Sequence, residues 1–172
     1  MRLISRLFVS LALLAGLPPS GLAQPAKAAK AVKGEYIAYA GTYTRPNKSK
    51  GIYAWRFHPV NGKVTAIGLV GETASPSFLA VHPNRKFLYA VNEVSNFEGK
   101  QAGSVSAFAM DTTTGRLKLL NTVSSRGDGP CHLALDPSGK WLFAANYGGG
   151  SVAEYPVHDD GTLGLYLNKS IK

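Results

Sequence analysis

The stretch GPCHLALDPSGKWLFAANYGGGSVAEY, residues 129–155, holds the residue types that most often carry chemistry. Cys131 is the only cysteine of the chain and stands beside His132, and a thiol next to an imidazole can form a nucleophile with its base. No known nucleophile motif surrounds Cys131, so a small buried filler is the better interpretation. Glycines 148–150 lack the Lys-Ser/Thr of a phosphate loop and precede an alternating segment rather than a helix, which indicates a turn.

The same stretch is one copy of an internal repeat. Ser75–Glu93 aligns without a gap with Gly129–Tyr147, and eight of the 19 aligned positions are identical. An alternating apolar segment and a Gly-containing turn follow each copy, so the unit is about fifty residues long, a period typical of propellers and solenoids. Each unit predicts four short strands and no helix longer than a turn. Four-stranded antiparallel units repeated radially form a β-propeller, so we predict an all-β propeller.

The repeat divides the folded part of the chain, 35–172, into a half-blade at 35–73 and two blades at 75–124 and 129–172. The half-blade lacks the first strand of the unit, and eleven strands are predicted in all. Because a propeller needs at least about four blades, the sequence predicts the N-terminal portion of a longer propeller, covering about its first three blades. We expect a strand from the far C-terminus to complete the half-blade.

The first 34 residues are predicted to lie outside the propeller. Residues 1–23 are typical of a secretory signal peptide, because Arg2 and Arg6 flank the start of an apolar run at 7–17 and small residues follow it. That run is shorter than the roughly twenty residues of a membrane span, so we expect no stable membrane anchor. Residues 24–34 carry three lysines and no aromatic residue, as a flexible linker does. The protein is therefore expected to be exported, to the periplasm or the extracellular space.

Charge and cysteine content exclude several kinds of partner. The formal net charge is +9, but five of the 19 basic residues lie in the predicted leader and linker, and 14 basic and 10 acidic residues remain from Glu35 onward. No basic block is left, which argues against a nucleic-acid partner. A single cysteine allows no internal disulfide, and we find no metal-ligand cluster and no cofactor motif.

The propeller fold predicts where a site would form. The innermost strand of each blade runs along the central channel, so the loop before it and the loop after the second strand open on the same face. Glu93 and Tyr147 occupy equivalent repeat positions but differ, as a non-symmetric ligand site requires. Candidate substrate-binding residues at this mouth are Thr42, Tyr43, Asn92, Glu93, Arg126, His132, Asn146 and Tyr147.

The candidates are not equivalent. His132 could serve as acid, base or anion-binding group. Asn92 and Asn146 recur in both blades, which favours a structural role in closing a turn. Arg126 is the arginine expected nearest the mouth, where it could bind a substrate phosphate. His82 and Asp136, each directly before a proline, are interpreted as residues that accept hydrogen bonds from their own turns.

Taken together, "YAGTYT", "KGIYAWRF", "SPSFLAVHPNRKFLYAVNE" and "GPCHLALDPSGKWLFAANYGGGSVAEYPVHDDGTLG" resemble the lactonase family of seven-bladed propellers. This family includes propeller-type 6-phosphogluconolactonases and the related 3-carboxy-cis,cis-muconate lactonizing enzymes. The resemblance implies a seven-bladed ring that hydrolyses a sugar lactone at its central mouth, without metal or other cofactor. The lactone would be 6-phospho-D-glucono-1,5-lactone or an unphosphorylated relative. The resemblance also implies that the catalytic residues lie beyond Lys172, so that this segment alone would be inactive.

Two alternatives remain open at this point. The predicted leader favours a secreted, non-catalytic propeller that serves as an interaction platform. A ring-closing isomerase of the muconate type would share the fold and the mouth but consume no water. The oligomeric state stays open.

Overall fold

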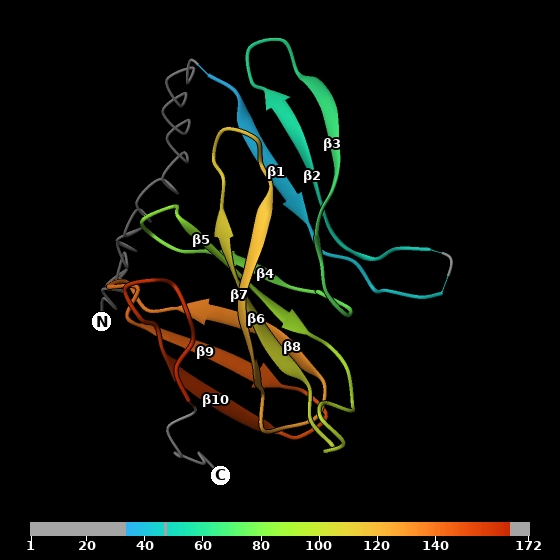
Figure 1. Ribbon diagram of the computed structural model, residues 1–172, viewed down its shortest axis with the longest axis vertical. Coiled ribbons are helices and arrows are strands. Elements are labelled where there is room, and N and C mark those ends of the chain that lie inside the picture. The colour runs from blue at the N-terminus through green and yellow to red at the C-terminus, as the bar shows by residue number, and fades with distance from the viewer. Residues whose placement is uncertain (1–33, 47, 166–172) are drawn as a thin grey trace, which may run out of the picture. The chain divides into compact units, whose positions relative to one another are not determined.

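The computed structural model describes residues 34–46 and 48–165 (Figure 1). All regular secondary structure in these ranges is β-strand, which confirms the predicted all-β class. The described part of the chain holds no helix with the length and hydropathy of a membrane span. The predicted leader, 1–23, and all but the last residue of the predicted linker lie outside the described residues.

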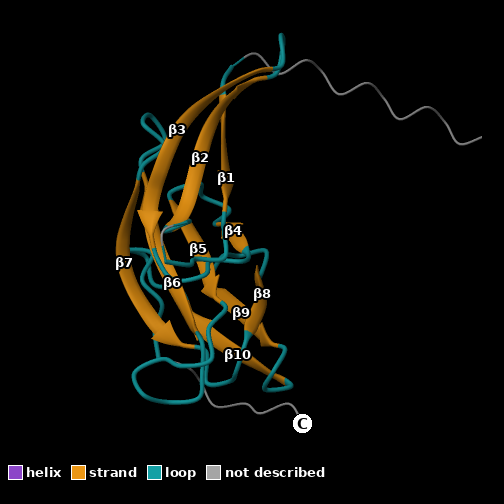
Figure 2. Cartoon of the chain, turned by 90° about the vertical axis from the view of Figure 1, so that its right-hand side faces the viewer, coloured by secondary structure: helices purple, strands orange, loops and turns teal. Residues whose placement is uncertain are grey.

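Ten strands form three antiparallel sheets that follow one another along the chain (Figures 1 and 2). The first sheet, in the order β1-β2-β3, contains β1 (Tyr36–Ala40), β2 (Gly51–His58) and β3 (Lys63–Glu72). The second, β4-β5-β6-β7, contains β4 (Leu79–Val81), β5 (Phe87–Asn92), β6 (Ser104–Met110) and β7 (Leu117–Ser124). The third, β10-β9-β8, contains β8 (Pro130–Leu135), β9 (Trp141–Asn146) and β10 (Ser151–Pro156). We call these sheets the first, second and third blades.

The third blade differs from the expectation of four strands. Where an eleventh strand was predicted, the described residues show an isolated bridge between Val157 and Leu163. The remainder of the predicted strand, 166–172, lies outside the described residues. The first blade has the three strands that its sequence predicted, and β1 pairs only with β2 among the described strands.

Adjacent blades pack through alternating side chains of the central strands. All six residues of β5 are buried, because the two faces of the strand meet different neighbours. Phe87, Tyr89 and Val91 join a core that includes residues of the third blade. Leu88 and Ala90 join a second core, with residues of the first blade. One six-residue segment thus connects both hydrophobic cores, as blade-on-blade packing requires.

Two buried asparagines tie each blade to the one before it. The Asn92 amide donates to Thr73 Oγ1 and to the Ala74 carbonyl, both at 2.6 Å, and so reaches from the second blade to the end of the first. The Asn146 amide donates to the Ser125 carbonyl at 2.9 Å, just after the second blade. Both side chains are buried, at 2% and 3% exposure. The repeated asparagine therefore has the structural role that its recurrence favoured.

The two asparagines differ in the hydrogen bonds of their side-chain oxygens, which leads to a prediction about stability. Asn92 Oδ1 accepts from Ser106 Oγ at 2.6 Å, whereas Asn146 Oδ1 is buried without a hydrogen bond to any described residue. Ala153 stands where the second blade has Ser106, since each lies two residues beyond the serine paired with its asparagine. Ala153→Ser should raise the free energy of unfolding by about 1 kcal/mol, because a buried acceptor gains a donor.

The measurement is urea unfolding of the full-length gene product. The matched control is Ala144→Ser, which adds a hydroxyl to the residue paired with Ala153 on the neighbouring strand. Ala144 is fully buried, and an unpaired hydroxyl there should destabilise by about 1 to 3 kcal/mol. Equal losses from both variants would contradict the prediction.

Candidate functional site

The loop leading into the first strand and the loop leaving the second meet at one end of the second blade and of the third. In the second blade the Glu93 backbone N–H donates to the Ser75 carbonyl at 3.0 Å. In the third blade the Tyr147 backbone N–H donates to the Gly129 carbonyl at 2.9 Å. These four residues hold equivalent repeat positions, so the same bond closes the same end of both blades. We call this end of the blades the mouth.

A hydrogen bond joins the first and second blades at the mouth. The Tyr43 hydroxyl donates to Glu93 Oε2 at 2.8 Å, across 50 positions of sequence. This donation to a carboxylate raises the pKa of the Tyr43 phenol above its ordinary value. The Ser77 hydroxyl opposes that shift, and the electrostatic influence of Cys131, from the third blade, adds to it. The Tyr43 hydroxyl of the first blade is thus influenced by residues of the second and third blades, although its side chain is 59% exposed.

A ring contact joins the second and third blades. The rings of Phe78 and His132 lie 4.2 Å apart between centroids, tilted by 46°. Both residues are at the same repeat position and both are exposed; Phe78 directly precedes β4, and His132 is the third residue of β8. A bulge at Cys131 interrupts the pairing of β8 with β9 directly before His132. Neither imidazole nitrogen bonds to a described residue, so both can meet a ligand or water.

The other predicted site residues are not brought into this group. Thr42 uses its hydroxyl within its own loop, bonded to Ser49 and donating to the Gly51 carbonyl at 2.7 Å. Tyr147 is 87% exposed. Arg126 is exposed too, in a left-handed backbone conformation with φ 56°, and its guanidinium bonds to no described residue. Asn92 and Asn146 are buried behind the mouth, with their amide groups bonded to protein.

Three residues near the mouth were not among the predicted substrate-binding residues. Phe78 could have been found, because the repeat aligns it with His132. Ser75 is buried and has φ 40°, and its signal was the alignment with Gly129, which has φ 58°. Asp128 carries a buried carboxylate oxygen with no hydrogen bond to the described residues. Its signal was a break in the repeat, since the second blade has an alanine at that position.

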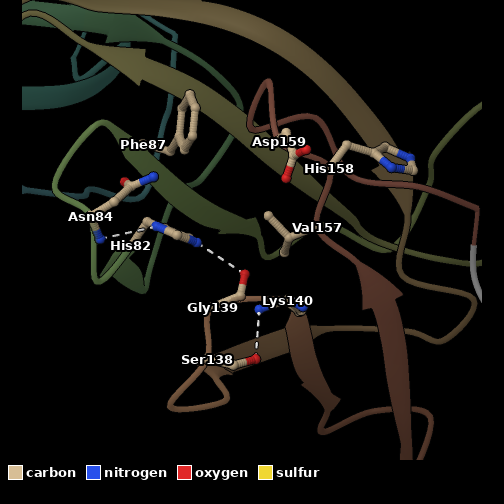
Figure 3. Close-up of a pocket in the computed structure, with 9 residues that line it drawn as sticks. All are labelled: His82, Asn84, Phe87, Ser138, Gly139, Lys140, Val157, His158 and Asp159. Carbon is tan, nitrogen blue, oxygen red and sulfur yellow. Dashed lines mark hydrogen bonds between the residues drawn. The ribbon is translucent and has the colours of Figure 1, made fainter.

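A cavity lies away from the mouth, at the turns between the first and second strands of the second and third blades (Figure 3). It has a volume of about 150 Å³ and lies between the second and third blades. His82 points into it, but Nε2 lies 2.9 Å from the Gly139 carbonyl and Nδ1 accepts from the Asn84 N–H at 3.1 Å. Both ring nitrogens of His82 are thus bonded to backbone groups. We therefore interpret this cavity as a packing gap between two blades and not as a ligand site.

The prediction that His82 and Asp136 organise their own turns is confirmed. Asp136 Oδ2 accepts from the Ser138 hydroxyl at 2.5 Å and from the Ser138 N–H at 3.1 Å. Donation by the Ser138 hydroxyl lowers the pKa of the Asp136 carboxyl. In the same way, His82 accepts a hydrogen bond from the backbone N–H two residues later in its turn.

In the part of the chain that the structure describes, no three His, Cys, Asp or Glu side chains gather as metal ligands.

Comparison with known proteins identifies the family of this chain. The family described as "Lactonase, 7-bladed beta-propeller" matches residues 37–169. The chain belongs to the lactonase family. The lactonase-family match runs through all three blades and includes every residue of the Tyr43, Glu93, Phe78 and His132 group.

Several members of the lactonase family are similar to this chain. A 6-phosphogluconolactonase of Bacillus subtilis is 31% identical over 129 residues, which are 75% of this chain and 35% of that protein. One of Formosa agariphila is 31% identical over 125 residues, 73% of this chain and 35% of that protein. The structure of the periplasmic gluconolactonase of Pseudomonas aeruginosa matches with a TM-score of 0.70 and 34% identity, over 78% of this chain and 38% of that one. The chain spans about a third of the length of these relatives.

Proposed function

We propose that this chain forms part of the substrate-binding wall of a sugar-lactone hydrolase. The observation that carries the proposal is the hydrogen bond between Tyr43 and Glu93, which links two blades at the mouth. The second carboxylate oxygen of Glu93 bonds to no described residue, so its two lone pairs can accept hydrogen bonds from two sugar hydroxyls. A carboxylate beside a phenol is a suitable partner for the hydroxyl groups of a polyol.

The pair of rings supplies the other half of sugar recognition. A pyranose lactone has a hydroxyl-rich edge and a face of C–H groups, and aromatic rings offer an apolar surface to such a face. Phe78 and His132 form a surface of this kind beside the Tyr43 loop. In the proposed reaction, water adds to the lactone carbonyl, the ring oxygen leaves from the tetrahedral intermediate, and the product is the open hydroxy acid.

That reaction needs a base for the water and donors for the oxyanion. We assign Tyr43, Glu93, Phe78 and His132 to binding, and propose that proton transfer falls to residues beyond Lys172, as the family resemblance implies. The names of the relatives support both a phosphorylated and an unphosphorylated lactone as substrate. Near the mouth, Arg126 is the residue of this chain that could bind a phosphate. Arg126→Ala should then weaken the binding of the 6-phosphorylated lactone and leave the binding of the unphosphorylated lactone unchanged.

We also propose that the protein is exported. The leader predicted at 1–23 supports this location, and a similar solved structure is that of a periplasmic enzyme. An unphosphorylated lactone is the substrate consistent with such a compartment. The N-terminal sequence of the mature protein would test the proposal, since cleavage near residue 23 is expected.

The deciding experiment is a hydrolysis assay of the full-length gene product. Glucono-1,5-lactone, its 6-phosphate and a carboxymuconate are offered in parallel; ring opening of the lactones is followed as acid release, and ring closure of the carboxymuconate as loss of its conjugated-diene absorbance. Hydrolysis of either sugar lactone well above the uncatalysed rate is the expected result. Turnover of the carboxymuconate alone would indicate the isomerase, and turnover of none would favour the interaction platform.

A further inference from the structure

Ser75 holds a backbone conformation that its residue type disfavours. Its φ is 40°, in the left-handed region where a Cβ is crowded, and the residue is buried. The equivalent residue of the third blade is Gly129, with φ 58°, which takes this conformation without such crowding. Backbone strain of this kind is often found at functional sites, where surrounding bonds maintain it. Compared with a glycine at this position, Ser75 adds a hydroxymethyl group, whose hydroxyl can form hydrogen bonds.

The hydroxyl and the N–H of Ser75 bind the loop that carries Tyr43. The Ser75 N–H donates to Thr44 Oγ1 at 3.0 Å, and the Thr44 N–H donates to Ser75 Oγ at 3.3 Å. This reciprocal pair fixes the residue next to Tyr43 against the second blade. The hydroxyl-to-hydroxyl distance is 3.4 Å, so the two side chains also lie in contact.

The carbonyl of Ser75 binds the other partner. It accepts the Glu93 N–H at 3.0 Å and the Ser77 N–H at 2.8 Å. Gly129 repeats only this backbone half, through the Tyr147 N–H. Ser75 is therefore bonded to the backbone on both sides of the Tyr43–Glu93 hydrogen bond, and the side-chain half of that arrangement has no counterpart at Gly129.

We propose that Ser75 is a positioning residue that holds Tyr43 and Glu93 together as one hydroxyl-binding pair. The inference rests on the proposed function, because it assigns a role within the same site. Ser75 itself does not touch the substrate. It acts by fixing the distance between the phenol of the first blade and the carboxylate of the second.

The test variant is Ser75→Gly in the full-length gene product, because glycine accepts the left-handed conformation, keeps the backbone N–H and carbonyl, and removes only the hydroxymethyl side chain. Loss of positioning should raise KM for the hydrolysed lactone about tenfold and change kcat by less than about twofold, since the pair binds and does not transfer protons. Thr44→Val removes the acceptor of the Ser75 N–H and should have the same effect. The double variant should lose little more than either single one.

A readout independent of turnover is the ionisation of Tyr43. Its phenol pKa is raised by the bond to Glu93, so Ser75→Gly should lower the pH at which this tyrosine ionises. Tyrosinate absorbance gives the value, with Tyr43→Phe in each background identifying its signal. Ser125→Ala is the matched control. It removes a buried serine hydroxyl bonded at 2.6 Å within the loop before the third blade and should change neither KM nor this ionisation.

The outcomes separate this inference from the proposed function. One possible outcome is that the protein hydrolyses no lactone but Ser75→Gly lowers the pH at which Tyr43 ionises. The positioning role then holds and the proposed substrate is wrong. If the protein hydrolyses a lactone and Ser75→Gly changes neither KM nor the pH at which Tyr43 ionises, the positioning role is wrong. A change in KM with an unchanged ionisation would also overturn it, because the Tyr43–Glu93 bond would then be intact.

Discussion

Glu93→Ala should lower kcat/KM for a sugar lactone about 100-fold in the full-length gene product. The carboxylate is expected to accept hydrogen bonds from two sugar hydroxyls, and bonds to a charged group contribute about 1.5 kcal/mol each at the low end. A loss of about 3 kcal/mol corresponds to roughly a hundredfold change in rate. Initial rates over a range of lactone concentrations would measure it.

Two further variants show whether the fall in kcat/KM is specific to residues at the mouth. Tyr43→Phe removes only the phenol that donates to Glu93 and should lower kcat/KM about fivefold, as expected for a single modest hydrogen bond. Glu72→Ala removes a carboxylate of equal charge from the exposed end of β3 and should leave kcat/KM unchanged. A loss below about threefold for Glu93→Ala, or an equal loss for Glu72→Ala, would contradict a role of Glu93 in binding.

Asn92→Ala should have the largest effect on stability, a loss of about 3 kcal/mol in the free energy of unfolding. The side chain is buried and makes four hydrogen bonds, two from its amide to the end of the first blade and two to its oxygen from Ser104 and Ser106. Alanine leaves the Ala74 carbonyl without its donor and opens a small cavity. The midpoint of urea unfolding should fall accordingly.

The repeat provides the control for this prediction. Asn146 is equally buried but makes only two side-chain hydrogen bonds to described residues, to the Ser125 carbonyl at 2.9 Å and to Ser151 Oγ at 3.2 Å. Its oxygen has no partner to lose among the described residues. Asn146→Ala should therefore cost about half as much as Asn92→Ala. A greater loss at Asn146 would show that the bonds between blades do not dominate the stability of these positions.

Much of the fold could be predicted because its determinants are local. Strand periodicity, turn residues and the repeat of Ser75–Glu93 in Gly129–Tyr147 gave the order of nearly all strands. His82 and Asp136 could be assigned to their turns for the same reason, since each accepts an N–H two residues away. The eleventh strand was predicted from the same periodicity, but only its bridge at Leu163 falls within the described residues.

The candidate site was less predictable, because its contacts join different blades. The sequence named Tyr43, Glu93 and His132 as candidates, and the propeller topology explains why their loops share one end. It did not pair Tyr43 with Glu93 or His132 with Phe78, since these contacts span 50 and 54 positions and depend on how each blade is rotated against the next. Asn92 and Asn146 satisfied the same sequence criteria, but the neighbouring blade buries them.

The sequence by itself therefore determined the all-β class, the blade repeat and the membership in the lactonase family. These features depend on strand periodicity, turn residues and repeated segments, which involve residues close together in the sequence. The tertiary structure alone decided which side chains of the mouth meet and which are buried. It also revealed the left-handed Ser75, whose strain is maintained by bonds to Thr44 in one blade and Glu93 in the other. Such a conformation is stable only when distant segments hold it, so no local pattern specifies it.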